Sequence, residues 1–252
     1  MSPETLIADP TTLSHALASD FEAEGKRALA ARGQFTIALP GGSVASAFFP
    51  RLALLSFDWT RTEFFWADER AVPSSDPESN YEMARSLWLG PARVPPARTH
   101  RMPAERTDLE SAARAYADDL RRIAGDPPCL DFVLLGVGAD GHVASLFPGH
   151  PMLSNERDLV AAVVDAPKPP PQRLTLTLPV LTGARRVVVA ALGTSKAGAI
   201  HHALEQRESM LPVASVLRRS TRPRLLLDDE AAAGLTASTR ALAGRPDRAG
   251  CA

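Results

Sequence analysis

Cysteine is almost absent from this sequence of 252 residues, which contains only Cys129 and Cys251. Two cysteines cannot form a disulfide framework, so we expect a reducing compartment and no structural disulfide. No stretch approaches the run of about 18 apolar residues that marks a membrane-spanning helix, and the first residues lack the pattern of a secretion signal. These features predict a soluble, cytoplasmic protein that does not bind membranes.

The sequence also lacks a surplus of charge of either sign. Its formal net charge is −1 at pH 7, so it has no basic field that would attract nucleic acid. A bound anion must therefore be held by a few local arginines and lysines. Apolar residues make up 45% of the chain, which is the proportion of an ordinary globular protein.

Several motifs of cofactor and metal chemistry are missing as well. There is no G-x-S-x-G nucleophile elbow and no Walker lysine, which argues against a serine acyl-enzyme and against ATP chemistry. Asp140, His142 and His150 are near one another in the sequence, but no His-x-x-x-His or Cys-x-x-Cys spacing supports a metal site. We therefore expect activity without a bound metal.

The most informative stretch is 131–150, DFVLLGVGADGHVASLFPGH. Its apolar run, 132–135, has the length and composition of a strand buried on both faces of a parallel sheet. Glycines follow that let the backbone turn sharply, and Asp140 and His142 lie among them. A histidine on such a turn, beyond the carboxyl end of a buried strand, lies where open α/β sheets bind ligands. His142 is therefore a candidate proton-transfer group.

The same glycines also match a dinucleotide-binding pattern. Gly136, Gly138 and Gly141 satisfy G-x-G-x-x-G, and Asp165 occupies the place of a ribose-binding acid. That fold requires a crossover of about 10 residues or more, usually a helix, between the two strands. Prolines and a glycine interrupt the segment soon after it starts, so the nicotinamide interpretation is disfavoured.

Strand and helix patterns alternate along the chain. The predicted strands are 35–39, 63–66, 132–135, 159–164, 174–178, 187–192 and 224–227, and the predicted helices are 12–32, 44–55, 80–89, 109–123, 197–205 and one from Asp228. Thr11 or Thr12 is the expected cap of the first helix, and Thr107 with Glu110 caps the fourth. The strand 174–178 alternates leucine with threonine, which predicts one less buried face.

This order predicts an α/β fold: a three-layer αβα sandwich with a mostly parallel, Rossmann-like sheet, helices on both faces and a small extra lobe near 153–178. We expect one domain over residues 1–233 and a flexible, Ala/Arg-rich tail over 234–252.

Polar residues directly follow four of the predicted strands. Ser43 ends a Pro-Gly-Gly turn at a helix start, Arg70 ends the cluster Asp-Glu-Arg, and His142 and Lys196 each follow a glycine turn. The Asp-Glu-Arg cluster by itself would be a solvated, salt-bridged turn. Because parallel strands bring their carboxyl ends to one edge, we expect these four residues to converge. A helix start, two cations and a histidine predict acid/base chemistry on a small phosphorylated or carboxylated molecule.

With these residues in view, the sequence resembles the glucosamine-6-phosphate isomerase/6-phosphogluconolactonase superfamily, and within it the lactonases. The resemblance covers most of the chain and preserves the family's order of motifs. It rests on ALPGGS (38–43), FFWADERAVP (64–73), SNYEMAR (79–85), the stretch 131–150, PKPPPQRLTLTLPVL (167–181) and the turn 193–196. Pro40 stands where the family more often has serine.

The resemblance implies a hydrolase of 6-phospho-D-glucono-1,5-lactone, in the oxidative pentose phosphate pathway, that uses neither metal nor cofactor. It implies that His142 is the base that activates water and that Asp140 orients its imidazole. The residues implied to bind the phosphorylated sugar lactone are Gly41, Gly42, Ser43, Arg70, Arg173 and Lys196. Asp68 is left without an assigned role. A monomer or a small homo-oligomer is expected.

Two alternatives stay open. A glucosamine-6-phosphate deaminase would share the Asp-Gly-His turn, but its pattern has tyrosine where this chain has Arg70 and a glutamate shortly after the histidine, where this chain has 145–147, Ser-Leu-Phe. A sugar-phosphate-binding regulator without catalysis would need a DNA-binding segment, of which the sequence gives no sign, and would not need an intact His142.

Overall fold

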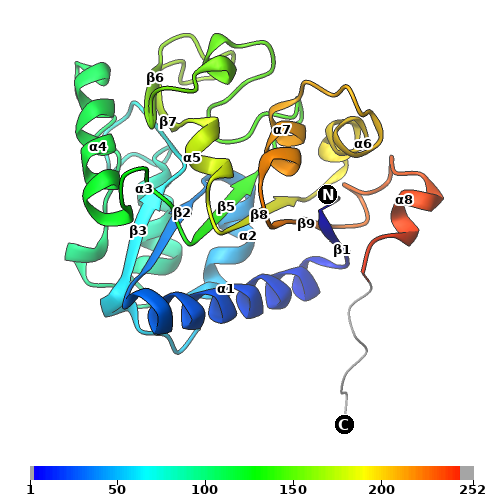
Figure 1. The fold of residues 1–252 in the computed structure, drawn as a ribbon, viewed down its shortest axis with the longest axis horizontal. Coiled ribbons are helices and arrows are strands. Elements are labelled where there is room, and N and C mark those ends of the chain that lie inside the picture. Colours follow the sequence, from blue (N-terminus) through cyan, green and yellow to red (C-terminus); the bar gives the residue numbers. More distant parts are fainter. Residues whose placement is uncertain (1–2, 245–252) are drawn as a thin grey trace.

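A six-stranded parallel sheet forms the centre of the computed structural model, which describes residues 3–244 (Figure 1). Its strand order is β1-β9-β8-β5-β2-β3, and a second sheet has the order β4-β7-β6. The strands are β1 (Glu4–Ile7), β2 (Phe35–Leu39), β3 (Thr62–Trp66), β4 (Asp68–Arg70), β5 (Phe132–Gly136), β6 (Val160–Val163), β7 (Arg173–Leu176), β8 (Arg186–Ala191) and β9 (Pro223–Leu227). The longer helices are α1 (Pro10–Arg32), α2 (Gly42–Leu52), α4 (Leu109–Ala124), α6 (Ala197–Glu205) and α7 (Pro212–Arg219).

Shorter helical segments connect these elements. They are α3 (Asn80–Ala84), α5 (Leu178–Thr182), α8 (Ala237–Ala241), a π-helical turn η2 (Arg85–Leu89), and 3-10 turns η1 (Trp59–Arg61), η3 (Pro96–Arg98), η4 (Pro151–Ser154) and η5 (Thr194–Lys196). None of the helices between residues 3 and 244 is both long and apolar enough to cross a membrane.

Helices cover both faces of the central sheet, as the sequence predicts. The connections β1-α1-β2 and β2-α2-β3 step across the sheet in one direction, whereas those from β5 to β8 and from β8 to β9 step in the other. Because parallel crossovers are right-handed, opposite steps place helices on opposite faces. Figure 1 shows α1 and α2 on one side of the strands and α5, α6 and α7 on the other. The three-layer αβα arrangement is confirmed.

Aromatic rings fill the space between α1, α2 and the sheet. The Phe21 ring of α1 meets Phe35 edge-on at a centroid distance of 5.0 Å, Trp88 at 5.4 Å and Phe132 at 5.6 Å. Phe21, Phe35 and Trp88 are completely buried. These rings join α1 to β2 and β5, and burying each contributes roughly 1.5–3 kcal/mol to folding. The carboxyl ends of β2 and β5 are thereby held on a rigid base.

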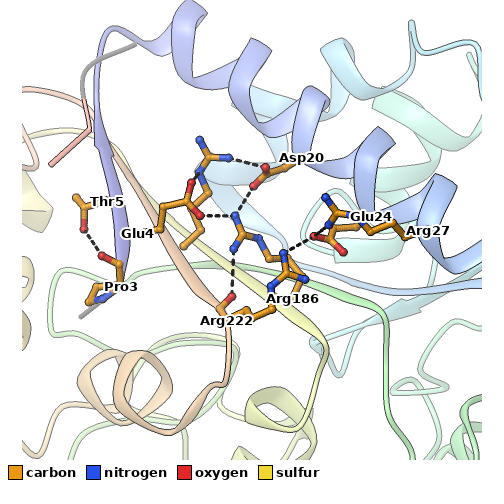
Figure 2. A network of polar contacts seen from close by, with 9 residues as sticks. Pro3, Glu4, Thr5, Asp20, Glu24, Arg27, Arg186 and Arg222 are labelled. Atoms are coloured by element: carbon orange, nitrogen blue, oxygen red, sulfur yellow. Dashed lines mark hydrogen bonds and ion pairs between the residues drawn. The ribbon is translucent and has the colours of Figure 1, made fainter. Parts of the chain in front are cut away.

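The strand β1 is absent from the sequence prediction. It has four residues and pairs in parallel with β9, from the other end of the chain. Charged side chains tie this edge together (Figure 2): the buried Arg186 guanidinium of β8 donates to the exposed Glu4 at 2.8 Å and to Asp20 of α1 at 3.0 Å. Arg224 of β9 lies 2.5 Å from the other Asp20 oxygen. No local pattern reveals a strand this short whose partner is over 200 residues away.

The small lobe is the second sheet, in which β7 pairs antiparallel with both β4 and β6. The cluster 68–70 is therefore a strand, not the solvated turn that the cluster by itself would suggest, and Asp68 and Glu69 are buried. β7 is buried on both faces, contrary to its expected half-exposure, because α4 contacts β6 and β7. The strand stops at Leu176, and α5 begins at Leu178 with Pro179 in its first turn, where no N–H donor is needed.

Two helix caps differ from the predicted ones. The Asp9 carboxylate accepts from the backbone N–H groups of Thr11 and Thr12, both at 3.0 Å, so aspartate and not threonine caps α1. Asp108 caps α4 in the same way through the N–H of Ser111. In both cases an ionised carboxylate next to the helix start is the stronger acceptor.

The last segment also differs from prediction. Asp228 starts turns and no helix. Its carboxylate accepts from the N–H of Ala231 at 2.7 Å and from the N–H of Gly193 in a neighbouring loop at 2.8 Å. Residues 234–244 were expected in a loose tail, yet they contain α8, and the N–H of Gly244 donates to Thr5 of β1 at 2.8 Å. The rest of that tail, 245–252, lies outside the described residues. The extent of the single domain stays a prediction.

Candidate active site

The carboxyl ends of β2, β5 and β8 open into a cavity of about 250 Å³ that β4 and the proline loop, 167–171, also line. Seven of the eight predicted site residues line it: Gly41, Gly42, Ser43, Arg70, His142, Arg173 and Lys196. The eighth, Asp140, lies behind His142 and contacts it. The expected convergence at one edge of the sheet is therefore observed.

One wall of the cavity is the start of α2. Gly41 is the N-cap and has no side chain to satisfy the first N–H groups of the helix, and Gly42 has a φ of 67° that favours glycine. A Cβ on Gly41 would lie 1.7 Å from the amide oxygen of Asn80, so only glycine fits there. Free N–H groups and the positive end of the helix dipole make this wall suited to an anion.

The glycine turn after β5 seats the imidazole of His142. The Gly138 N–H donates to the His142 carbonyl at 2.9 Å, and Gly141 has a φ of 84°. A Cβ on Gly138 would lie 2.0 Å from the His142 ring, so glycine makes room for the side chain. Only the short η4 occurs between β5 and β6, so no dinucleotide crossover helix exists and the disfavoured nicotinamide interpretation is wrong.

His142 and Asp140 form a close pair, with Nδ1 2.6 Å from the carboxylate Oδ1. Partial burial opposes ionisation of Asp140, but His142 and the Lys168 ammonium outweigh it and lower the pKa of Asp140 to about 2. An ionised carboxylate only accepts hydrogen bonds, so Nδ1 carries the proton. The lone pair of Nε2 is then available to take a proton from water.

Burial is the main reason why the pKa of His142 lies below its usual value. The charge of Lys168 lowers it further, and the carboxylates of Asp140 and Asp68 act in the opposite direction. The effects of burial and of Lys168 outweigh those of the two carboxylates, so the imidazole is mostly neutral near pH 7. A neutral imidazole is the form that acts as a base.

Cations gather around the cavity from three elements. Arg70 of β4 and Arg173 of β7 stand opposite each other in the antiparallel register, and Lys196 ends η5. Burial lowers the pKa of Lys196, and the nearby charge of Lys168 adds to that effect. Four cationic side chains, of Arg70, Lys168, Arg173 and Lys196, thus face two carboxylates, of Asp68 and Asp140. The site has a positive surplus that suits a phosphate.

Arg173 lines the cavity as expected, and its side chain also holds the proline loop. Its side chain is only 5% exposed, and its Nε and Nη2 donate to the carbonyls of Pro170, Lys168 and Pro169 at 3.0–3.1 Å. The guanidinium also lies 5.6 Å from the centre of the Phe147 ring. Most of its hydrogen bonds thus hold the proline loop, which leaves few for a substrate.

Buried polar residues on β4 and α3 join the walls of the cavity. Asp68 accepts from the Ser145 hydroxyl at 2.6 Å and from the Asn80 amide at 3.3 Å. Glu69, on the other face of β4, accepts from the N–H groups of Asn80 and Tyr81. Burial raises the pKa of Glu69, although these hydrogen bonds oppose it. These contacts fix the start of α3 against Gly41 and the histidine turn.

Sequence reasoning left three polar cavity residues without a role, Asp68, Asn80 and Lys168. Asn80 follows the serine cap of α3, and only the buried strand β4 explains why an amide is there. Lys168 stands in the proline-rich run 167–171, whose composition was a usable signal. No three His, Cys, Asp or Glu side chains within residues 3–244 are grouped so that they would hold a metal ion.

Comparisons with known proteins point to one family. Residues 8–226 match the family of glucosamine-6-phosphate isomerases and 6-phosphogluconolactonases. The chain is 41% identical over 209 residues to the 6-phosphogluconolactonase of Rattus norvegicus, covering 80% of each chain, and 38% identical over 224 residues to that of Streptomyces coelicolor, covering 84% of this chain and 86% of the relative.

Other relatives are longer, and solved structures share the fold. The chain spans only 62% of the length of the probable chloroplastic 6-phosphogluconolactonase 3 of Oryza sativa, to which it is 37% identical over 205 residues, or 75% of this chain. The structure of the 6-phosphogluconolactonase of Trypanosoma brucei matches with a TM-score of 0.82 at 29% identity, over 93% of this chain and 99% of that one.

Proposed function

Because the chain belongs to the glucosamine-6-phosphate isomerase/6-phosphogluconolactonase family, we propose that it hydrolyses 6-phospho-D-glucono-1,5-lactone to 6-phospho-D-gluconate. This is the lactone-opening step of the oxidative pentose phosphate pathway. One observation carries the proposal: a neutral histidine with an available Nε2 lines the same cavity as a helix N-terminus and a surplus of cations. An enzyme that hydrolyses a phosphorylated ester needs a base to activate water and positive charge to bind the phosphate.

The phosphate binds, in this proposal, at the start of α2. The N–H groups of Gly42 and Ser43 donate to its oxygens, and Arg70 and Lys196 supply the positive charge. Gly41 permits the close approach of the backbone. Lys196 suits this role because no carboxylate within residues 3–244 forms an ion pair with it. The phosphate then orients the lactone ring toward His142.

His142 acts as the general base when water attacks, and it returns the proton when the ring opens. Its Nε2 takes a proton from water while the water oxygen bonds to the lactone carbonyl carbon, and Asp140 stabilises the imidazolium that forms. The tetrahedral intermediate then expels the ring oxygen, which receives the proton from the imidazolium. The new carboxylic acid ionises in solution. No covalent intermediate with the protein is required, and we propose no metal or cofactor.

The family also contains isomerases and deaminases, from which the residues around His142 differ. The loop that follows it has no carboxylate between Val143 and Phe147, and the Ser145 hydroxyl there is committed to Asp68. Arg70 adds a cation for the phosphate. These features favour ester hydrolysis over amine release.

Product analysis tests the proposal. The purified protein is given the phosphorylated lactone or glucosamine 6-phosphate, and the spontaneous hydrolysis of the lactone is measured in parallel and subtracted. We expect rapid formation of 6-phosphogluconate and no release of ammonia. Ammonia release without lactone hydrolysis would make the protein a deaminase. Binding of both compounds without turnover of either would indicate a regulator. The cytoplasmic location and the oligomeric state stay predictions.

A further inference from the structure

Lys168 lies next to both residues of the Asp140–His142 pair. Its ammonium donates to Asp140 Oδ1 at 3.1 Å and lies 3.4 Å from His142 Nδ1. Oδ1 therefore accepts from both the lysine and the imidazole. Since Nδ1 already gives its proton to Asp140, it has no lone pair for Lys168. The effect of the ammonium on the ring is electrostatic.

The backbone at Lys168 is unusually restrained for a loop. Prolines occupy 167 and 169–171, which fixes the φ angle at each of these positions. Arg173 donates to the carbonyls of Lys168, Pro169 and Pro170, and the Ala166 N–H donates to the carbonyl of Pro171. The loop thus presents a lysine from a fixed point of the second sheet.

Arg173 is itself held against the ring that supports the histidine. Phe147 lies 5.6 Å below the guanidinium and 4.7 Å from the centre of the His142 ring. Contacts therefore run from β7 through Arg173 to Lys168, and separately through Phe147 to the imidazole. Both routes end at His142.

We propose that Lys168 is a positioning residue for His142 and that Arg173 acts through Lys168, a role that rests on the proposed function. The ammonium fixes the shared carboxylate oxygen, which in turn fixes the imidazole with Nε2 available to the cavity. It also places a positive charge beside the ring and so opposes formation of the imidazolium. Asp140 from the same turn and Asp68 from β4 are the charges that favour the imidazolium.

The distribution of lysine supports a specific role. The whole sequence contains three lysines, Lys26, Lys168 and Lys196, and two of them line this cavity. Lys168 is paired with Asp140, whereas no carboxylate within residues 3–244 forms an ion pair with Lys196. The two cations are therefore suited to different tasks, Lys196 to the phosphate and Lys168 to the base.

The pKa of His142 in the free protein tests this role without any substrate. It is measured by NMR on protein with labelled histidine, and the signal among the six histidines is assigned with His142→Asn. In Lys168→Met we expect the pKa of His142 to rise, because a positive charge that opposes protonation is removed. Lys168→Arg keeps that charge and should restore the wild-type value. Lys26→Met, on the exposed surface of α1, is the matched control and should leave it unchanged.

In Lys168→Met the pH profile of hydrolysis should move to higher pH, together with the pKa of His142. A raised pKa keeps the inactive imidazolium to higher pH, so Lys168→Met should lose more of its kcat at about pH 5.5 than at about pH 8.5. Arg173→Lys, which cannot bridge three carbonyls, should shift the profile the same way. The double variant should shift it no further than Lys168→Met alone.

An unchanged or lowered pKa of His142 in Lys168→Met would overturn the assignment. So would shifts of the two single variants that add in the double variant. A raised KM for the lactone with both pKa and kcat profile unchanged would make Lys168 a substrate-binding residue. Failure of the wild type to hydrolyse the lactone would instead refute the proposed function, on which the NMR measurement does not depend.

Discussion

Two charged clusters in this protein differ in their balance. At the edge formed by β1, β9 and β8, Arg186 and Arg224 each form ion pairs with both Glu4 and Asp20, so these four charges cancel. Figure 2 shows them beside Glu24, which Arg27 and Arg222 share. In the cavity, four cations face two carboxylates. A balanced cluster holds chain segments together and needs no ligand. A cluster with surplus charge is completed only when an anion binds.

The two clusters also differ in what is buried with them. Arg186 bridges the first strand and the first helix, segments that the chain must bring together to fold. His142 lies among glycine turns, whose backbone N–H groups and small volume serve the approach of a ligand. Substitutions in the first cluster should therefore change stability, and those in the second should change activity.

The largest expected effect is that of His142→Asn on catalysis. Removal of a positioned base typically reduces the rate about 10²–10⁴-fold. Binding of 6-phosphogluconate should be nearly unchanged, because the anion-binding groups lie on other loops. Rates and product affinity measured on the same folded preparation check this. If the variant hydrolyses the lactone within about threefold of wild type, His142 is not the base.

A smaller effect is expected when Arg70 or Lys196 is replaced by alanine. A hydrogen bond to a charged group contributes roughly 1.5–3 kcal/mol, so affinity for the phosphorylated lactone should fall about 10- to 150-fold. The unphosphorylated lactone should be nearly unaffected, and Lys26→Ala should behave as wild type. Equal losses for both lactones would show that these residues do not recognise the phosphate.

Arg186→Met should act on stability alone. It leaves Asp20 with one partner fewer in a mostly buried place, which typically costs about 1–3 kcal/mol. Denaturant unfolding measures the loss, and kcat of the folded protein should match wild type. A large fall in kcat with unchanged stability would mean that the two clusters are coupled.

The smallest effect is a displacement of the pH profile. Because burial and Lys168 lower the pKa of His142, the imidazole stays neutral to lower pH than a free histidine. The acid limb of kcat/KM should therefore have its midpoint below about 6.5, the ordinary value for histidine. A midpoint at or above that value would show that burial and Lys168 do not lower the pKa of His142.

Much of the fold follows from local patterns. The apolar runs of β2, β3, β5 and β8 reveal buried parallel strands, and the glycine turns after them mark the edge at which the site forms. His142 and the start of α2 were identifiable for this reason. Each depends on residues that are neighbours in the chain.

The sequence by itself thus determined five strands of the parallel sheet, the helices α1, α2, α4 and α6, and the edge at which Ser43, Arg70, His142 and Lys196 meet, but it gave no sign of α5 or α7. Only the tertiary structure decided that 68–70 is a buried strand, that β1 joins the opposite end of the chain, and that Arg173 holds the proline loop. These features depend on pairing between distant segments. An alternation of apolar and polar residues, or a glycine turn, can be recognised from neighbouring residues in the sequence. The partner of a short strand or of a buried charge depends instead on how distant segments pack together.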